Sequence, residues 1–223
     1  MKVVFMGTPE FALPCLEALV GSRHKPVGVV SAPPKPSGRG LKVKPSPVEL
    51  RARELGLDVQ TPEKLKDTGF LGWLRGLNPD VSAVVAFRYL PREVFSLPRR
   101  GSVNLHASLL PKYRGASPIN WALYNGERKT GVTTFLLDDR VDTGAILAQR
   151  ECPIGPDETA GELTERLARL GAELLLETLD GLEAGTLMPV PQSEAGAGLA
   201  PKLKREDGFI RWDRSALQVH NQI

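Results

Sequence analysis

Short apolar runs alternate with amphipathic segments along the first part of the chain. Residues 3–6 are apolar and predict a buried strand. A helical segment follows, in which Thr8 is the expected N-cap, Pro9 the first helical residue and Gly21 the stop. A second apolar run at residues 26–31 completes a predicted βαβ unit with parallel strands. The turn between strand and helix reads Gly-Thr-Pro-Glu-Phe instead of Gly-x-Gly-x-x-Gly, which argues against a dinucleotide site.

The same alternation continues to about residue 184. Helices are expected at residues 49–55, 70–77 and 119–124, and strands at residues 57–60, 81–87, 102–107, 131–137 and 145–149. Thr159 and Glu162 form a capping box before a leucine stripe with helical spacing, which predicts a long helix packed on the core. The pattern as a whole predicts a doubly wound α/β fold with a mainly parallel sheet.

The composition changes after Gly185, where the chain becomes rich in Pro, Gly and Ala as far as Pro201. We therefore expect one domain over residues 1–184, followed over residues 185–223 by a linker and the start of a C-terminal region. Within this tail, residues 209–212 are expected to form an edge strand. Ser215 is expected to begin a helix.

Size and charge limit the function classes only loosely. The 223 residues, 41% of them hydrophobic, suffice for a sizeable core, and the net charge of +3 permits a polyanionic partner without requiring one. Cys15 and Cys152 have no metal-binding or disulfide spacing, so we expect no metal and a reducing compartment. No apolar run approaches the roughly 18 residues that span a bilayer. We expect a cytoplasmic monomer without membrane contact.

The candidate chemistry lies in the strand at residues 102–107. Its alternation places Asn104 and His106 on one face, where an amide donor and an imidazole suit a reaction that develops an oxyanion and moves a proton. Asp142 is the best candidate for orienting the imidazole. Two structural explanations stay open, because a strand histidine is often held by a backbone carbonyl, and an Asp-x-Gly sequence often forms an Asx-turn.

A basic stretch lies between residues 33 and 47, which carries Lys35, Arg39, Lys42 and Lys44 but no acidic residue. A loop of this length is often functional. The alternative is a solvated surface loop.

These residues resemble the formyltetrahydrofolate-dependent formyltransferases. The family signature Asn-x-His-x-Ser-Leu-Leu-Pro corresponds to residues 104–111, and the Asp-x-Gly that follows it corresponds to residues 142–144. Residues 5–12, 38–48 and 206–212 are similar to the members that act on methionyl-tRNA, so the resemblance covers nearly the whole chain. It implies a Rossmann-like formyltransferase fold and transfer of a formyl group from 10-formyltetrahydrofolate to the amino group of initiator methionyl-tRNA.

The resemblance also implies roles for individual residues. Asn104, His106 and Asp142 are the expected catalytic residues: His106 assists removal of a proton from the attacking ammonium, Asn104 donates to the oxyanion, and Asp142 orients His106 or a relaying water. The expected folate-binding residues are Ser108, Leu109, Leu110, Pro111, Phe87, Arg88, Tyr89, Leu90, Asp138 and Asp139. The expected tRNA-binding residues are Lys35, Arg39, Lys42 and Lys44, of which Arg39 aligns with the key arginine of these members.

Two features keep alternatives open. Residues 87–91 are one residue shorter than the Tyr-Gly-x-Ile-Leu-Pro of many family members. The catalytic triad is shared by enzymes that formylate sugar nucleotides or glycinamide ribonucleotide, so it does not identify the acceptor amine. A non-catalytic tRNA-binding module is the remaining alternative. Family members that act on methionyl-tRNA usually continue into a β-barrel domain that helps to hold tRNA, so the resemblance implies that the C-terminal region begun in residues 185–223 is truncated.

Overall fold

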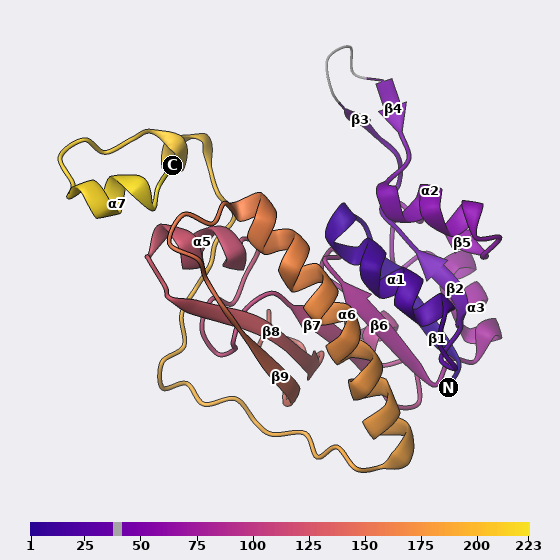
Figure 1. Cartoon of the computed structure of the whole chain (residues 1–223). Helices are drawn as coiled ribbons and strands as arrows, with labels where there is room; N and C mark the ends of the chain where they lie inside the picture. The colour runs from indigo at the N-terminus through magenta and orange to yellow at the C-terminus, as the bar shows by residue number, and fades with distance from the viewer. Residues whose placement is uncertain (38–41) are drawn as a thin grey trace.

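The computed structural model describes residues 1–37 and 42–223, which are built around a seven-stranded sheet (Figure 1). The strand order is β5-β2-β1-β6-β7-β8-β9. Five strands are parallel: β1 (Val3–Gly7), β2 (Pro26–Val30), β5 (Val59–Gln60), β6 (Val81–Val85) and β7 (Ser102–His106). β8 (Lys129–Leu136) runs antiparallel to β7, and β9 (Ile146–Pro153) runs antiparallel to β8.

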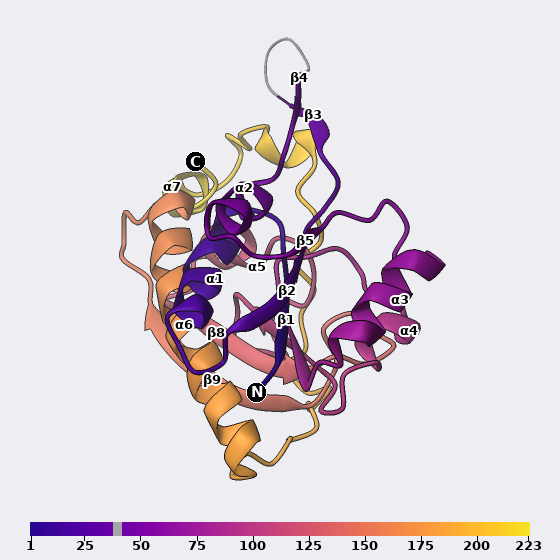
Figure 2. The same ribbon diagram turned by 90° about the vertical axis from the view of Figure 1, so that its right-hand side faces the viewer.

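Helices cover both faces of this sheet, as the edge-on view in Figure 2 shows. One face packs against α1 (Leu13–Val20), α2 (Pro47–Glu54) and α6 (Ala160–Ala184), and the other against α3 (Thr68–Leu77) and α4 (Arg92–Phe95). Successive residues of β1 alternate between the two cores, because side chains along a strand point to opposite faces. The predicted doubly wound, mainly parallel α/β fold is confirmed.

The strand order reverses beside β1. The chain winds from β1 through β2 to β5 on one side and then crosses to β6 and β7 on the other. In open α/β sheets, such a reversal opens a crevice at the carboxyl ends of the strands, where ligands bind. The loops that follow β1, β6 and β7 border this crevice.

The long helix α6 follows the sequence pattern closely. Its capping box is present, since the Thr159 backbone N–H donates to Glu162 Oε2 at 2.9 Å and the Glu162 N–H donates to Thr159 Oγ1 at 3.3 Å. Its leucine stripe, which includes Leu163, Leu167 and Leu175, is buried against the sheet. Within the described part of the chain, no helix combines the length and the apolar composition needed to cross a membrane.

Three local predictions were wrong. The first helix starts at Leu13 behind a short 3₁₀ turn, and the carbonyl of the expected cap Thr8 instead accepts from the Val48 N–H. The irregular basic loop contains a β-hairpin made of β3 (Lys35–Ser37) and β4 (Lys42–Lys44). Residues 209–212 form no strand; η2 (Arg205–Gly208) and α7 (Ala216–His220) lie on either side, and Trp212 remains 77% exposed.

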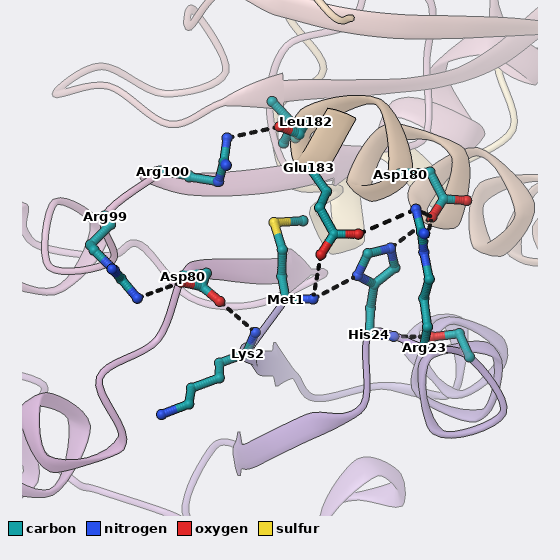
Figure 3. A network of polar contacts seen from close by, with 11 residues as sticks. Met1, Lys2, Arg23, His24, Asp80, Arg99, Arg100, Asp180, Leu182 and Glu183 are labelled. Atoms are coloured by element: carbon teal, nitrogen blue, oxygen red, sulfur yellow. Dashed lines mark hydrogen bonds and ion pairs between the residues drawn. The ribbon is translucent and has the colours of Figure 1, made fainter. Parts of the chain in front are cut away.

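A polar cluster ties the start of β1 to the end of α6 (Figure 3). The Met1 ammonium donates to Glu183 Oε1 at 3.1 Å, and the buried His24 contacts Asp180 Oδ1 at 2.8 Å. Hydrogen bonds from His24 and from Arg23 lower the pKa of Asp180. Because an ammonium and a guanidinium balance the two carboxylates, the cluster has no excess negative charge for a metal ion.

Asp80 makes a second link in the same region (Figure 3). Its carboxylate accepts from the Lys2 backbone N–H at 2.7 Å and from Arg99 at 2.8 Å. The backbone hydrogen bond, followed by the Arg99 charge, lowers the pKa of Asp80. This carboxylate therefore joins the first strand to the β6–β7 connection.

Candidate active site

A cavity of about 550 Å³ lies at the carboxyl ends of β6 and β7, on the face that also carries α3 and α4. Its walls come from the β1–α1 connection (Phe11), the loop after β6, the loop after β7 and the loop after β8. α4 is only four residues long and contributes Phe95 to the lining, whereas the loop after β8 contributes residues from Leu137 to Asp142. The cavity therefore lies in the crevice that the strand order predicts.

Asn104 and His106 reach this cavity from β7. They lie two residues apart on the same face, and Asn104 is paired with Val84 of β6 and Phe135 of β8. No hydrogen bond joins the Asn104 amide to another side chain or backbone group of the described residues. The amide is therefore available to a ligand.

His106 is held in one orientation by two contacts. Its Nε2 lies 2.8 Å from the Tyr113 carbonyl oxygen, and its Nδ1 lies 3.7 Å from Asp142 Oδ2. A carbonyl only accepts hydrogen bonds, so Nε2 carries a proton, and the lone pair of the neutral ring is on Nδ1. The backbone contact that offered a purely structural explanation is present, but it uses only one ring nitrogen and leaves the other facing Asp142.

Asp142 is fixed by a contact distant in sequence. Its Oδ2 accepts from the Gly115 N–H at 2.8 Å, and the side chain is only 14% exposed. The local turn belongs to Asp138 instead, whose carboxylate accepts from the Arg140 N–H and the Thr143 hydroxyl. The Asx-turn explanation therefore applies to Asp138, while the carboxylate of Asp142 faces the imidazole.

The residues expected to bind folate divide into two groups. Phe87, Arg88, Tyr89 and Leu90 line the cavity together with Asp138. Arg88 donates to the Glu63 carbonyl at 2.9 Å, and burial lowers the pKa of its guanidinium.

The other expected folate residues lie outside the cavity lining. The Ser108 hydroxyl donates to the Lys112 carbonyl at 2.6 Å, and the Leu110 N–H donates to Thr133 Oγ1 at 3.2 Å, so residues 108–111 build the turn that brings Tyr113 to His106. Asp139 contacts Arg92 at 3.4 Å. Direct folate contact by Ser108, Leu109, Leu110, Pro111 and Asp139 stays a prediction that the cavity lining does not support.

The basic hairpin projects beyond the body of the fold, above α2 (Figure 1). Lys35 and Lys44 lie opposite one another in its register, and both are exposed. Lys42 belongs to β4, whereas Arg39 lies outside the described residues. The hairpin is anchored near the sheet by the Ser31 hydroxyl, which contacts the Ser46 hydroxyl at 2.6 Å.

Sequence reasoning missed the contribution of the segment after α6. Gln192 donates to the carbonyls of Asp142 and Gly144, and the backbone of residues 198–200 bonds to Arg114. A single glutamine in a stretch rich in Pro, Gly and Ala carries no periodic signal. Its importance follows only from its place in three dimensions.

Comparison with known proteins establishes the family. The family model described as "Formyl transferase" matches residues 1–179, about four fifths of the chain. The chain belongs to the formyl transferase family. Two similar relatives of this family are the methionyl-tRNA formyltransferases of Citrifermentans bemidjiense, 47% identical over 224 residues, and of a Synechococcus strain, 51% identical over 227 residues. Each match covers 100% of this chain and 70% of the relative.

Solved structures of lower sequence identity share the same formyl transferase fold. An N-formyltransferase of Helicobacter canadensis, in complex with folinic acid and dTDP-3-aminofucose, has a TM-score of 0.75 at 21% identity and aligns with 100% of this chain and 79% of its own. A phosphoribosylglycinamide formyltransferase of Streptococcus pneumoniae has a TM-score of 0.67 at 20% identity, over 82% of this chain and 98% of its own. At these identities, the likeness supports the fold alone.

Proposed function

We propose that this chain transfers a formyl group from 10-formyltetrahydrofolate to the amino group of initiator methionyl-tRNA. Relatives named methionyl-tRNA formyltransferase are 46–51% identical to this chain over its whole length. The solved formyltransferases whose names point to amino-sugar acceptors are only 19–21% identical. The chemical part of the proposal depends on one observation: Nδ1 of His106 faces the Asp142 carboxylate inside the cavity.

His106 acts as the base, at Nδ1. The attacking amine must lose a proton as its nitrogen bonds to the formyl carbon, and the hydrogen bond from Nε2 to the Tyr113 carbonyl leaves Nδ1 as the free acceptor. The imidazolium that forms lies next to the Asp142 carboxylate, which stabilises its charge. As the bond between the formyl carbon and the donor nitrogen breaks, the imidazolium passes this proton to that nitrogen, so the product amide keeps one N–H and His106 is neutral again.

Asn104 stabilises the oxygen of the formyl group. As the amine adds, this oxygen gains negative charge, and an amide N–H donor fixed on a strand costs no reorganisation during the reaction. Asn104 is on the same face as His106, two residues away, and its amide makes no hydrogen bond to the described residues. The donor and the base can therefore act on the same carbon from neighbouring positions.

The folate donor occupies the apolar part of the cavity. The volume of about 550 Å³ lies in the range typical of small-molecule sites. Phe87, Leu90, Phe95 and Leu137 give this part an aromatic and aliphatic lining, which suits a flat pterin ring. When bound, 10-formyltetrahydrofolate supplies the activated formyl group.

Lys35, Arg39, Lys42 and Lys44 contact the phosphates of the tRNA acceptor end. Two observations support this assignment: the hairpin bears exposed lysines, and it is anchored by Ser31 beside the carboxyl ends of the strands, at the same edge as the cavity. Lysine contacts to phosphates give affinity that falls with salt.

The proposal extends to the organisation of the protein. Residues 1–184 form the catalytic unit and residues 185–223 the segment connected to it. The enzyme acts as a monomer in the cytoplasm. Gel filtration coupled to light scattering checks the monomer, and a dimeric mass would contradict it.

One assay separates this function from its alternatives. With 10-formyltetrahydrofolate as donor, formyl transfer is measured to methionyl initiator tRNA, to free methionine and to an amino-sugar nucleotide, with His106→Ala as the inactive control. We expect a kcat/KM for the charged tRNA that exceeds the others by orders of magnitude. Preference for a free amine contradicts the acceptor, and tRNA binding without any transfer supports the non-catalytic module instead.

A further inference from the structure

A segment outside the family match crosses the active-site loops. We call residues 190–200 the crossing segment; Figure 1 shows it passing β9 and rising beside α5 (Pro118–Tyr124). At one end, Val190 and Ile146 exchange two backbone hydrogen bonds of 2.8 Å. At the other end, the Arg114 N–H donates to the Gly198 carbonyl at 2.8 Å, and the Ala200 N–H donates to the Arg114 carbonyl at 2.7 Å.

Gln192 joins the two loops between these ends. Its Nε2 donates to the carbonyls of Asp142 at 3.0 Å and Gly144 at 2.8 Å, while its Oε1 accepts from Arg114 Nε at 3.1 Å and from a terminal Arg114 nitrogen at 2.9 Å. Both donors and both lone pairs of the amide are used. The side chain of Arg114 is only 8% exposed, and its other terminal nitrogen contacts Glu194 at 3.1 Å. The link joins a buried arginine to a half-buried glutamine, and all four hydrogen-bonding positions of the Gln192 amide are used.

The loop that Gln192 holds needs external support. Asp142 has φ of 53°, a conformation that costs a non-glycine residue free energy and persists only where the surroundings enforce it. Gly144 lies so close to β8 that a Cβ atom would be 1.6 Å from the Leu136 carbonyl oxygen. The carbonyls of these two loop residues are the ones that Gln192 binds.

Arg114, the other partner of the link, lies between the two backbone groups that contact His106 and Asp142. Arg114 stands between Tyr113, whose carbonyl accepts from His106, and Gly115, whose N–H donates to Asp142. A shift of Arg114 relative to the loop after β8 would therefore change the separation of the imidazole and the carboxylate. Two side chains fix this relative position: Asp142, through the Gly115 N–H, and Gln192, through Arg114 and the loop carbonyls.

We propose that Gln192 and Arg114 are positioning residues for formyl transfer, which hold the Asp142 carboxylate against Nδ1 of His106. The inference rests on the proposed function. It predicts that the crossing segment, which follows the catalytic unit of residues 1–184, completes the active site of that unit, although it lies outside the residues that the family model matches.

The test begins with Gln192→Met, which keeps the length of the side chain and removes all four hydrogen bonds. We expect kcat for methionyl-tRNA to fall about 10- to 100-fold, since a displacement of about 1 Å can cost 100-fold, while the KM of each substrate stays within about twofold. Gln192→Glu keeps only the acceptors for Arg114 and should be impaired as well. Ser193→Ala is the matched control, because among residues 1–37 and 42–223 the only hydrogen bond of this neighbouring hydroxyl is the one it accepts from the Ala195 N–H, and the variant should keep the activity of the parent.

A double-mutant cycle separates positioning from stability. If Gln192 acts through Asp142, adding Gln192→Met to Asp142→Ala lowers kcat no further. Full additivity, a parental kcat in both Gln192→Met and Gln192→Glu, or a loss of activity that thermal unfolding accounts for would each overturn the proposal. If Gln192→Met does not fold, Gln192→Glu carries the cycle. Failure of the parent to formylate methionyl-tRNA would instead refute the proposed function, so the two failures are distinguishable.

Discussion

Replacing Asp142 by Asn removes one charge from the site and leaves its shape nearly unchanged. The Asn oxygen can still accept from the Gly115 N–H, so the loop should stay in place. At the 3.7 Å between Asp142 Oδ2 and His106 Nδ1, a full charge pair gains about 1 kcal/mol in water and about 4 kcal/mol at an effective dielectric constant of about 20. Because the two side chains are only 14% and 8% exposed, we use about 3 kcal/mol for the interaction energy of this charge pair.

This value predicts a fall in kcat of about 100-fold, because each 1.4 kcal/mol of lost transition-state stabilisation slows the reaction about tenfold. The carboxylate acts on the charge that develops on His106, so the KM values for folate and for charged tRNA should change less than about threefold. Single-turnover formyl transfer under saturating substrates measures the chemical step directly, and thermal unfolding checks that the fold is intact. A variant within threefold of the parent rate would refute the electrostatic role of Asp142.

Further substitutions test the other assignments. Asn104→Ala should lower kcat by about 100-fold while folate binding, followed by fluorescence titration, survives; near-parental turnover would exclude Asn104 as the oxyanion donor. In the double variant Lys35→Ala/Lys44→Ala, the salt dependence of tRNA affinity should become shallower by about one logarithmic unit per lost contact. Lys66→Ala is the control, because this lysine lies outside the hairpin and pairs with Glu93 at 2.9 Å, and it should keep the parental slope. Equal slopes in all three proteins would mean that the hairpin is only solvated. Asp80→Asn should cost about 1 kcal/mol of unfolding free energy at pH 7, measured with urea. The pKa of Asp80 is lowered in the folded state, so its contribution to the unfolding free energy is present above the unfolded pKa of about 3.9 and is lost as the pH falls through the folded value. The unfolding free energies of parent and variant should therefore converge below about pH 4. A difference between them that stays constant with pH would contradict the linkage.

The fold could be predicted largely because its signals are local. The apolar run in β6, the capping box at Thr159 and the leucine stripe of α6 each encode an element through neighbouring residues, and the structure contains all three. The prediction of Thr8 as a helix N-cap was wrong because its carbonyl accepts a hydrogen bond from the N–H of Val48, a residue forty positions away. An edge strand at residues 209–212 failed in the same way, since a strand needs a partner edge and no local pattern supplies one.

The site could be predicted in part. Alternation along β7 is enough to place Asn104 and His106 on one face, because the period of a strand is two. Asp142 was expected beside His106, and it lies there. A local turn does not hold its carboxylate in place; the N–H of Gly115, which is distant in sequence, does. Which ring nitrogen of His106 carries the proton could not be predicted, because the Tyr113 carbonyl decides it.

The amino-acid sequence by itself determines the order of strands and helices, the side-chain types at Asn104 and His106, and the basic character of the hairpin, since each depends on residue type and on spacing of a few positions. Tertiary structure alone decides which groups meet. Gln192 lies 50 positions from Asp142, and Gly115 lies 27 positions from it, but both bind Asp142 at hydrogen-bond distance. Such contacts come from the winding of the sheet and the return of the chain after α6, which bring distant polar groups together at the ends of the strands. Once these groups are removed from water, they must form hydrogen bonds with one another or with a ligand.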